Sequence, residues 1–383
     1  MTTTGPDGPD SAGSPDSAGG ASAEPATRGT PRVYGRPAAG LVARRQSRHP
    51  LRTAVLAAVA MVVVTVVAGY LWLRSEANPS GPEGPQVIVT VRSGTGVSQL
   101  GSSLQAKHVI RSSFAFRVWG QFHSVPGVLA GDYAFRQNSS FATVDQIIAS
   151  GPNVFALQIP AGFTVSEVAQ RVGQLPGHDA TTFDQLAIGG TVRSPWEPAG
   201  SANLDGLLGT GTYIVVPGET DTRLLTAMVQ RFDALADRVQ LTTGAATLGL
   251  TPYQAVVAAS IVQKEGFIVK NMGQVARVIL NRLADNMPLQ MDSTVLYAEG
   301  RDGGTVTSAD LALKSPYNSY LNKGLTPTPI CFPSAAALQA ALAPPAGSWL
   351  YFVVVEPDGT EAFADTFAGQ QANEALAQQR GLP

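Results

Sequence analysis

A run of 21 residues without a charge, residues 53–73, limits most strongly what this chain of 383 residues can fold into. As a helix, a run of that length crosses about 30 Å of hydrocarbon. Tyr70 and Trp72 lie near its far end, where aromatic side chains favour the membrane interface. We therefore predict one membrane-spanning helix over residues 53–73. Four arginines precede the run: Arg44, Arg45, Arg48 and Arg52.

Charge predicts the orientation of this helix. Residues 1–52 carry seven arginines and four acidic residues, a local charge of +3, whereas the whole chain has a formal charge of -2. Basic segments stay on the cytoplasmic side of a membrane, so we expect a single-pass cell-membrane protein with a cytoplasmic N-terminus. A cleaved signal peptide is the alternative, although its apolar region would usually be shorter and start nearer the N-terminus. The net charge also argues against a nucleic-acid partner.

The segments that flank the apolar run have the composition of unfolded chain. Residues 1–52 are rich in Gly, Pro, Ser, Thr and Ala, so they bury too little apolar surface to fold. We predict that they form a disordered, basic cytoplasmic tail. Residues 74–86 contain several Pro and Gly residues and are interpreted as a linker.

Beyond the linker the pattern predicts an α+β fold in two domains. A small module over residues 87–151 has a strand-helix-helix-strand pattern and a further helix, expected at 87–91, 96–107, 112–122, 131–135 and 143–150. A mixed α+β domain over residues 152–383 is expected to begin with a strand at 154–159. One helix is predicted to begin after Thr164 or Ser166. Four more are predicted at 224–236, 252–265, 274–283 and 294–299.

Glu265 is the most informative residue of the second domain. It ends a nearly uncharged helix that begins with the capping pair Thr251 and Pro252 and stops at Gly266. A carboxylate against an apolar wall is poorly solvated, which favours its proton-donating form. Glu265 is therefore our candidate general acid. A solvated glutamate at a helix end remains the alternative from spacing alone.

Two other groups could act as nucleophiles. Ser260 and Lys264 are four residues apart on the same predicted helix, as a Ser-Lys hydrolase requires, but Ser260 is far from the helix N-terminus where an oxyanion site would form. Cys331 is the single cysteine, and all four histidines precede the last 205 residues. Because cysteine catalysis needs a base, we interpret Cys331 as a buried structural residue.

The segments after Glu265 are rich in amide, hydroxyl and aromatic groups, which commonly line a saccharide cleft. For Asp292 a helix cap is an equal alternative, and Tyr317 and Asn318 could instead shape a turn after Pro316. The candidates for binding the saccharide or orienting Glu265 are Asn281, Arg282, Gln290, Asp292, Tyr317 and Asn318.

Four motifs in one order carry a family resemblance: ASIVQKE at 259–265, VARVILNRL at 275–283, LQMDSTVLY at 289–297 and SPYNSYLNKGL at 315–325. Through them the chain resembles the YceG-like endolytic murein transglycosylases. The resemblance extends from the apolar run to about Asn373, and the module at 87–151 is similar to that family's LysM-like domain.

The resemblance implies a peptidoglycan lytic transglycosylase with Glu265 as its general acid and base. Such an enzyme cleaves the β-1,4 bond between N-acetylmuramic acid and N-acetylglucosamine and leaves 1,6-anhydro ends. It needs no metal and no cofactor, and the resemblance suggests peptidoglycan synthases as partners. The alternative is a weakened or inactive relative that binds peptidoglycan and scaffolds synthesis enzymes.

Four residues depart from the family's pattern. Gln263 replaces a Glu, Gly211 replaces an Asp, and Glu361 and Gln370 stand where the family tends to have histidines. These departures concern the groups that would support Glu265, and through them the rate of the reaction that the resemblance implies.

Overall fold

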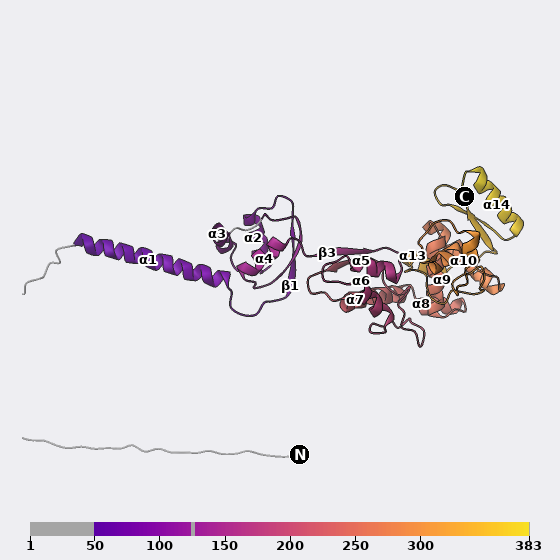
Figure 1. Cartoon of the computed structure of the whole chain (residues 1–383), viewed down its shortest axis with the longest axis horizontal. Coiled ribbons are helices and arrows are strands. Elements are labelled where there is room, and N and C mark those ends of the chain that lie inside the picture. Colours follow the sequence, from indigo (N-terminus) through magenta and orange to yellow (C-terminus); the bar gives the residue numbers. More distant parts are fainter. Residues whose placement is uncertain (1–49, 124–126, 383) are drawn as a thin grey trace, which may run out of the picture. The chain divides into compact units, whose positions relative to one another are not determined.

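The computed structural model describes residues 50–123 and 127–382, and the chain divides into two compact units, Met1–Val64 and Thr65–Pro383. The expected disordered tail lies outside the described residues up to residue 49, and so do Arg44, Arg45 and Arg48. Of the first unit, the structure describes the beginning of helix α1 (Pro50–Ala77). This helix is continuous (Figure 1) and is long and apolar enough to cross a membrane. It extends beyond both ends of the predicted range 53–73.

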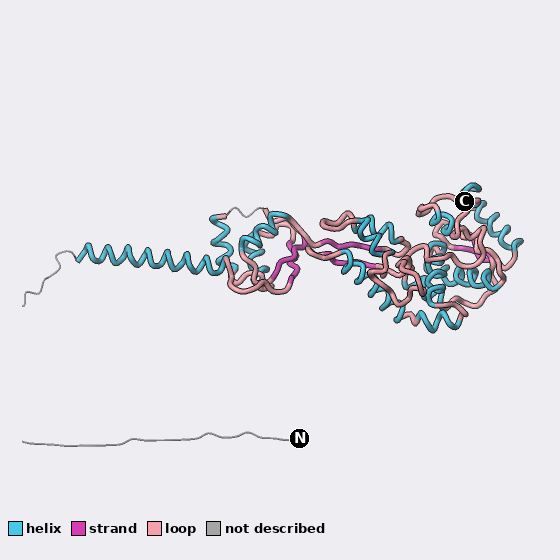
Figure 2. Tube along the Cα trace, turned by 60° about the horizontal axis from the view of Figure 1, so that its bottom comes forward, coloured by secondary structure: helices cyan, strands magenta, loops and turns pink. Residues whose placement is uncertain are grey.

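The second unit has a mixed α+β fold, as predicted. Within the described residues, three separate two-stranded antiparallel sheets pair β1 with β2, β3 with β4, and β5 with β6. Figure 2 shows each strand pair with its own surrounding helices. Because a two-stranded sheet is only marginally stable by itself, each pair depends on the helices packed against it.

The upstream module follows the predicted strand-helix-helix-strand order. It consists of β1 (Gln86–Val91), α2 (Val97–Ala106), α3 (Ser113–Phe122), β2 (Gly131–Arg136) and α4 (Phe141–Ser150). The strands pair in register from Gln86 with Arg136 to Val91 with Gly131. Side chains of Ser112 and Ser140 cap α3 and α4, which explains why both helices begin where they do.

The first part of the domain predicted over residues 152–383 packs around one apolar core. It contains β3 (Phe155–Ile159), α5 (Val165–Val172), α6 (Ala180–Ile188), β4 (Gly211–Val215), α7 (Asp221–Arg238) and α8 (Leu241–Thr247). Thr164 and Glu167 form the capping box that starts α5. Gly211 has a φ of 128°, and a Cβ there would lie 2.8 Å from the Arg231 guanidinium, so glycine fits this close approach.

A second core lies among α10 (Val269–Ala284), α11 (Asp292–Ala298), β5 (Tyr351–Val354) and β6 (Glu361–Ala364). Helix α13 (Ala335–Leu342) contributes to both cores. The other elements of this part are α12 (Ser308–Leu311) and α14 (Phe367–Gln379). Between the cores runs α9 (Pro252–Glu265), whose Val256 belongs to the first core and whose Ile261 and Val262 belong to the second. The first core therefore holds the N-terminal part of the helix that carries Glu265, and the second core holds its C-terminal part.

Candidate active site

A cleft of about 920 Å³ opens at the C-terminal end of α9. One wall comes from α5 and α6, and the other from the end of α9, the beginning of α11 and the loop 300–304. Acidic, amide, hydroxyl and aromatic side chains share its surface, as in sites that bind polar ligands in a fixed orientation. Glu265 lies on this surface.

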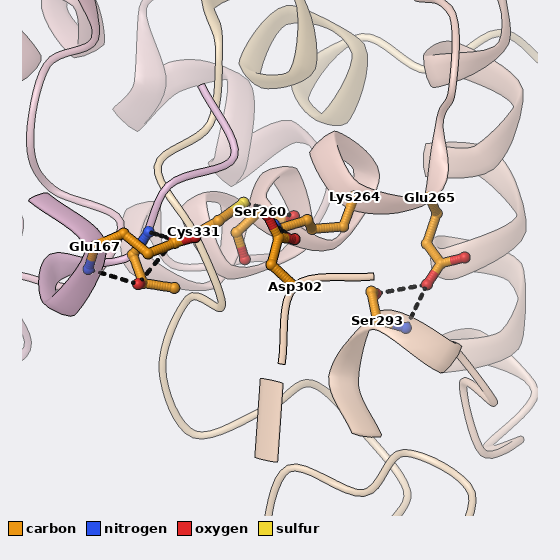
Figure 3. Close-up of polar contacts among 8 residues, drawn as sticks. Glu167, Ser260, Lys264, Glu265, Ser293, Asp302 and Cys331 are labelled. Atoms are coloured by element: carbon orange, nitrogen blue, oxygen red, sulfur yellow. Dashed lines mark hydrogen bonds and ion pairs between the residues drawn. The ribbon is translucent and has the colours of Figure 1, made fainter. Parts of the chain in front are cut away.

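The carboxyl group of Glu265 is half-buried and held by one neighbour (Figure 3). Its Oε1 accepts hydrogen bonds from the Ser293 hydroxyl at 2.5 Å and the Ser293 N–H at 3.1 Å. Its Oε2 accepts no hydrogen bond from a described residue, which leaves one oxygen for a ligand in the cleft. Ser293 thus fixes one oxygen of Glu265 and leaves the other available.

Burial raises the pKa of Glu265 above its ordinary value of 4.5. The hydrogen bonds from Ser293 oppose this rise, the negative charge of Asp292 adds to it, and the positive charge of Arg282 opposes it. Glu265 is also the last residue of α9, where the partial negative charge of the helix C-terminus disfavours a carboxylate. The environment therefore shifts Glu265 towards its proton-donating form, the direction expected from the sequence.

Three of the six accessory candidates lie on the cleft: Arg282, Gln290 and Asp292. Arg282 is only 6% exposed, and its guanidinium donates to the carbonyls of Leu350, at 2.6 Å, and Leu289. Asp292 is the first residue of α11 and accepts a 2.5 Å hydrogen bond from the Tyr320 hydroxyl. Gln290 is exposed and adopts a positive φ of 50°.

The other three candidates do not line this cleft. The Asn281 amide donates to the carbonyls of Gly347 and Trp349 at 3.1 and 2.9 Å. Tyr317 shares a 2.9 Å hydrogen bond with Thr328, and Asn318, which is fully buried, donates to the carbonyls of Leu311 and Leu313 at 2.9 Å. These contacts are those of residues that fix the backbone of loops.

The cleft also contains functional groups that the sequence analysis did not single out. Ser293 directly follows the predicted Asp292 in the motif at 289–297, and this position was the available signal. Asp205 and Tyr297 lie on the cleft too, and the Tyr297 hydroxyl donates to Asp205 at 3.3 Å. Burial raises the pKa of Asp205. Their pairing joins residues 92 positions apart, which spacing along the chain does not reveal.

The two alternative nucleophiles have other partners (Figure 3). The fully buried Ser260 hydroxyl donates to the Val257 carbonyl at 2.7 Å and accepts from the Ile330 N–H at 3.0 Å. Lys264 forms an ion pair with Asp302. Cys331 is 1% exposed, and burial raises the pKa of its thiol to about 12. A Ser-Lys dyad and a reactive thiolate therefore both lack geometric support.

The departures at Gln263 and Gln370 have structural contacts of their own. The Gln263 side chain accepts from the Ser334 N–H at 2.9 Å, at the start of α13. The Gln370 amide donates to the Phe352 carbonyl at 3.2 Å and to Glu374 at 3.0 Å. Gln370 thus supports the cleft wall, because Phe352 is one of the lining residues, whereas Gln263 fixes the start of α13.

Glu361 is the departure that bears most directly on Glu265. It is only 6% exposed, and neither carboxyl oxygen has a hydrogen-bond partner among the described residues. The preceding residues are tied to α10, since Asn271 donates to the Gly359 carbonyl at 2.9 Å and Lys270 donates to Thr360 at 2.6 Å. Burial and then the charge of Glu265 raise the pKa of Glu361 to about 8, while the Asn271 amide opposes the rise.

We expect Glu361 to make the protein less stable as the pH rises. A carboxyl group whose folded pKa is raised contributes full stability below about 4.5, its value in the unfolded chain, and loses it as pH rises through about 8. Glu361→Gln should melt near the wild-type temperature at pH 5 and above it at pH 8. Differential scanning calorimetry across this range tests the difference, with the exposed Asp365→Asn as control. A parallel pH dependence in the two proteins would contradict the expectation.

A protonatable carboxyl on the wall of an open polar cleft, in an α+β domain, is an arrangement that enzymes use to cleave glycosidic bonds by acid-base catalysis. The chain belongs to the YceG-like family, whose model matches residues 89–375.

Two bacterial relatives are similar over most of this chain. The endolytic murein transglycosylase of Streptococcus pneumoniae (serotype 2, strain D39) is 27% identical over 320 residues, which is 76% of this chain and 58% of the relative. That of Bacillus subtilis (strain 168) is 27% identical over 304 residues, or 73% of this chain and 81% of the relative. The chain therefore spans less than two thirds of the streptococcal protein's length.

A solved structure shares the fold. The crystal structure of a yceG-like protein from Listeria monocytogenes superposes with a TM-score of 0.53 and 24% sequence identity. The match covers 75% of this chain and 98% of the solved one. The folded arrangement described above is thus one that a second chain of low sequence identity also adopts.

Proposed function

We propose that this protein is a peptidoglycan lytic transglycosylase that cleaves the β-1,4 bond between N-acetylmuramic acid and N-acetylglucosamine within a glycan strand. One observation carries the proposal: in a YceG-like chain, the carboxyl of Glu265 lies on the cleft with a raised pKa and one free oxygen. The relatives named endolytic murein transglycosylases support the substrate class.

In the proposed reaction, Glu265 first acts as an acid. Its proton passes to the glycosidic oxygen as the bond from that oxygen to the muramic acid C1 breaks, and the N-acetylglucosamine side leaves as an alcohol. The resulting carboxylate then takes the proton of the muramic acid 6-hydroxyl, whose oxygen bonds to C1 and closes the anhydro ring. Ser293 holds the carboxyl during both transfers, and the nearby positive charge of Arg282 stabilises the carboxylate.

Intramolecular attack explains why one carboxyl group suffices. Glycosidases that use water or a protein nucleophile need a second carboxylate, whereas here the attacking oxygen belongs to the substrate. A tethered hydroxyl has a high effective molarity, so positioning replaces the second catalyst. Asp292, the cleft acid beside Ser293, is bound by the Tyr320 hydroxyl and raises the pKa of Glu265 through its charge.

The proposal also places the protein at a membrane. We propose that α1 spans the cell membrane with the N-terminus in the cytoplasm, and that the module over β1 to α4 is LysM-like and faces the cell wall with the cleft. Peptidoglycan strands would then be reached from the membrane surface, beside the synthases that we propose as partners.

Product analysis tests the reaction. We expect the full chain, in detergent micelles with un-crosslinked glycan strands, to produce 1,6-anhydro ends that contain no oxygen from isotopically labelled water. Mass spectrometry of the released fragments measures both features. Reducing ends that carry the labelled oxygen would indicate a hydrolase and contradict the proposal. Binding of strands without any new ends would favour the inactive scaffold.

A further inference from the structure

Helix α3 exposes an apolar stripe on its surface. Phe114 is 57% exposed, Phe122 is 78% exposed, and Val118 between them is half-buried. These residues are spaced four apart, so they lie along one side of the helix. The module's core uses the neighbouring side, where Ala115 and Phe116 are fully buried. The stripe is therefore additional to the apolar surface that the fold itself requires.

The stripe begins next to the end of the apolar helix α1. The ring of Trp72 lies 6.2 Å from the ring of Phe114, and Leu73 and Ala77 pack against the core of the module. Figures 1 and 2 both show α3 beside this last part of α1. Trp72 is one residue from the end of the charge-free run, at the level where a spanning helix meets the headgroups.

We propose that the stripe of Phe114, Val118 and Phe122 inserts into the outer interface of the bilayer that α1 crosses. The inference rests on the proposed membrane anchoring. Phenylalanine and valine side chains lose water on entering the boundary of headgroups and acyl chains, which makes such a helix lie in the interface plane. The exposed Arg117, whose guanidinium lies 5.9 Å from the centre of the Phe114 ring, suits lipid phosphates.

A second membrane contact would restrict the module. A single spanning helix lets its attached domain rotate about the helix axis and tilt, whereas a helix lying in the interface removes much of this freedom. Because Leu73 and Ala77 already join α1 to the module's core, α3 would fix the face of the module that meets the lipid.

Depth-dependent quenching tests the contact in the full chain. A fluorescent label is attached at Val118→Cys, and the protein is reconstituted into vesicles of phosphatidylethanolamine and phosphatidylglycerol that contain nitroxide-labelled lipids. The native Cys331 is 1% exposed and does not compete for the label. Matched labels are placed at Ile214→Cys on β4, which is 55% exposed, and at Val63→Cys within α1.

We expect quenching at position 118 to exceed that at position 214 several-fold. In the Phe114→Ser, Phe122→Ser double variant, quenching at position 118 should fall towards the value at position 214, while the melting temperature stays unchanged. Equal quenching at 118 and 214 with strong quenching at 63 would overturn the contact and leave the anchor intact. Weak quenching at all three positions would instead overturn the membrane anchoring itself. A double variant that keeps the wild-type quenching would also contradict the role of the two phenylalanines.

Discussion

Glu265→Gln should lower the rate of anhydro-end formation by about 10²- to 10⁴-fold, the usual contribution of a positioned acid-base group. The amide cannot give a proton to the leaving oxygen or take one from the 6-hydroxyl. Its carbonyl oxygen can still accept the hydrogen bonds that Ser293 now donates to Oε1, so the fold should be preserved. Single-turnover measurements with glycan strands of defined length determine the rate without interference from product release.

Asp302→Asn is the matched control for this substitution. Asp302 also lines the cleft, but it is exposed and forms an ion pair with Lys264. Exposed ion pairs contribute little to stability, so the control should stay within a few-fold of the wild-type rate. An equal loss in both variants would show that the cleft needs its charge and not the proton of Glu265. Full activity of Glu265→Gln would remove Glu265 from the mechanism.

Arg282→Met should destabilise the second unit by about 2–6 kcal/mol, because each of the two carbonyls left without a donor costs about 1–3 kcal/mol. Its guanidinium holds the carbonyls of Leu350 and Leu289, and its charge opposes the raised pKa of Glu265. The substitution should therefore raise the pKa of Glu265 further. Denaturant unfolding measures the stability. The alkaline limb of the plot of reaction rate against pH gives the pKa of Glu265.

Asn281→Ala separates the two effects of Arg282. Asn281 is the preceding residue of α10 and also holds two carbonyls, those of Gly347 and Trp349, but it does not line the cleft. We expect Asn281→Ala to destabilise the protein but to leave the alkaline limb of the pH–rate profile, and so the pKa of Glu265, unchanged. If Arg282→Met also left that limb unchanged, Arg282 would be a structural residue only. Arg282→Lys should restore part of the pKa effect but not the paired hydrogen bonds.

Local patterns predicted much of the helical framework. The capping pair at Thr251 and Pro252 and the apolar run that follows it define α9 to its last residue, and α1 appears as one apolar helix. The strands after residue 200 were not predicted. β4 lies in a glycine-rich stretch, and β5 and β6 are four residues each, too short for alternation to distinguish them from loops.

The accessory residues show how far the sequence alone could predict which side chains form the site. Asn318 and Tyr317 share their amide and phenol chemistry with sugar-binding residues, yet their hydrogen bonds go to nearby loop groups. Residue type alone does not distinguish these uses. Ser293 and Glu361 lie 28 and 96 positions from Glu265 in the sequence, and only folding brings them to it. Their effect on the carboxyl therefore requires the tertiary structure.

The position of α9 between two cores has a consequence for how the protein unfolds. Val256 and Ile261 belong to different cores, although they are little more than one helical turn apart. Neither core can unfold without exposing part of α9, on which the other core also depends. Heat or destabilising substitutions in either half should therefore abolish turnover and folded structure in a single cooperative transition. If the proposed function holds, partly unfolded forms that still cut glycan strands would then be rare.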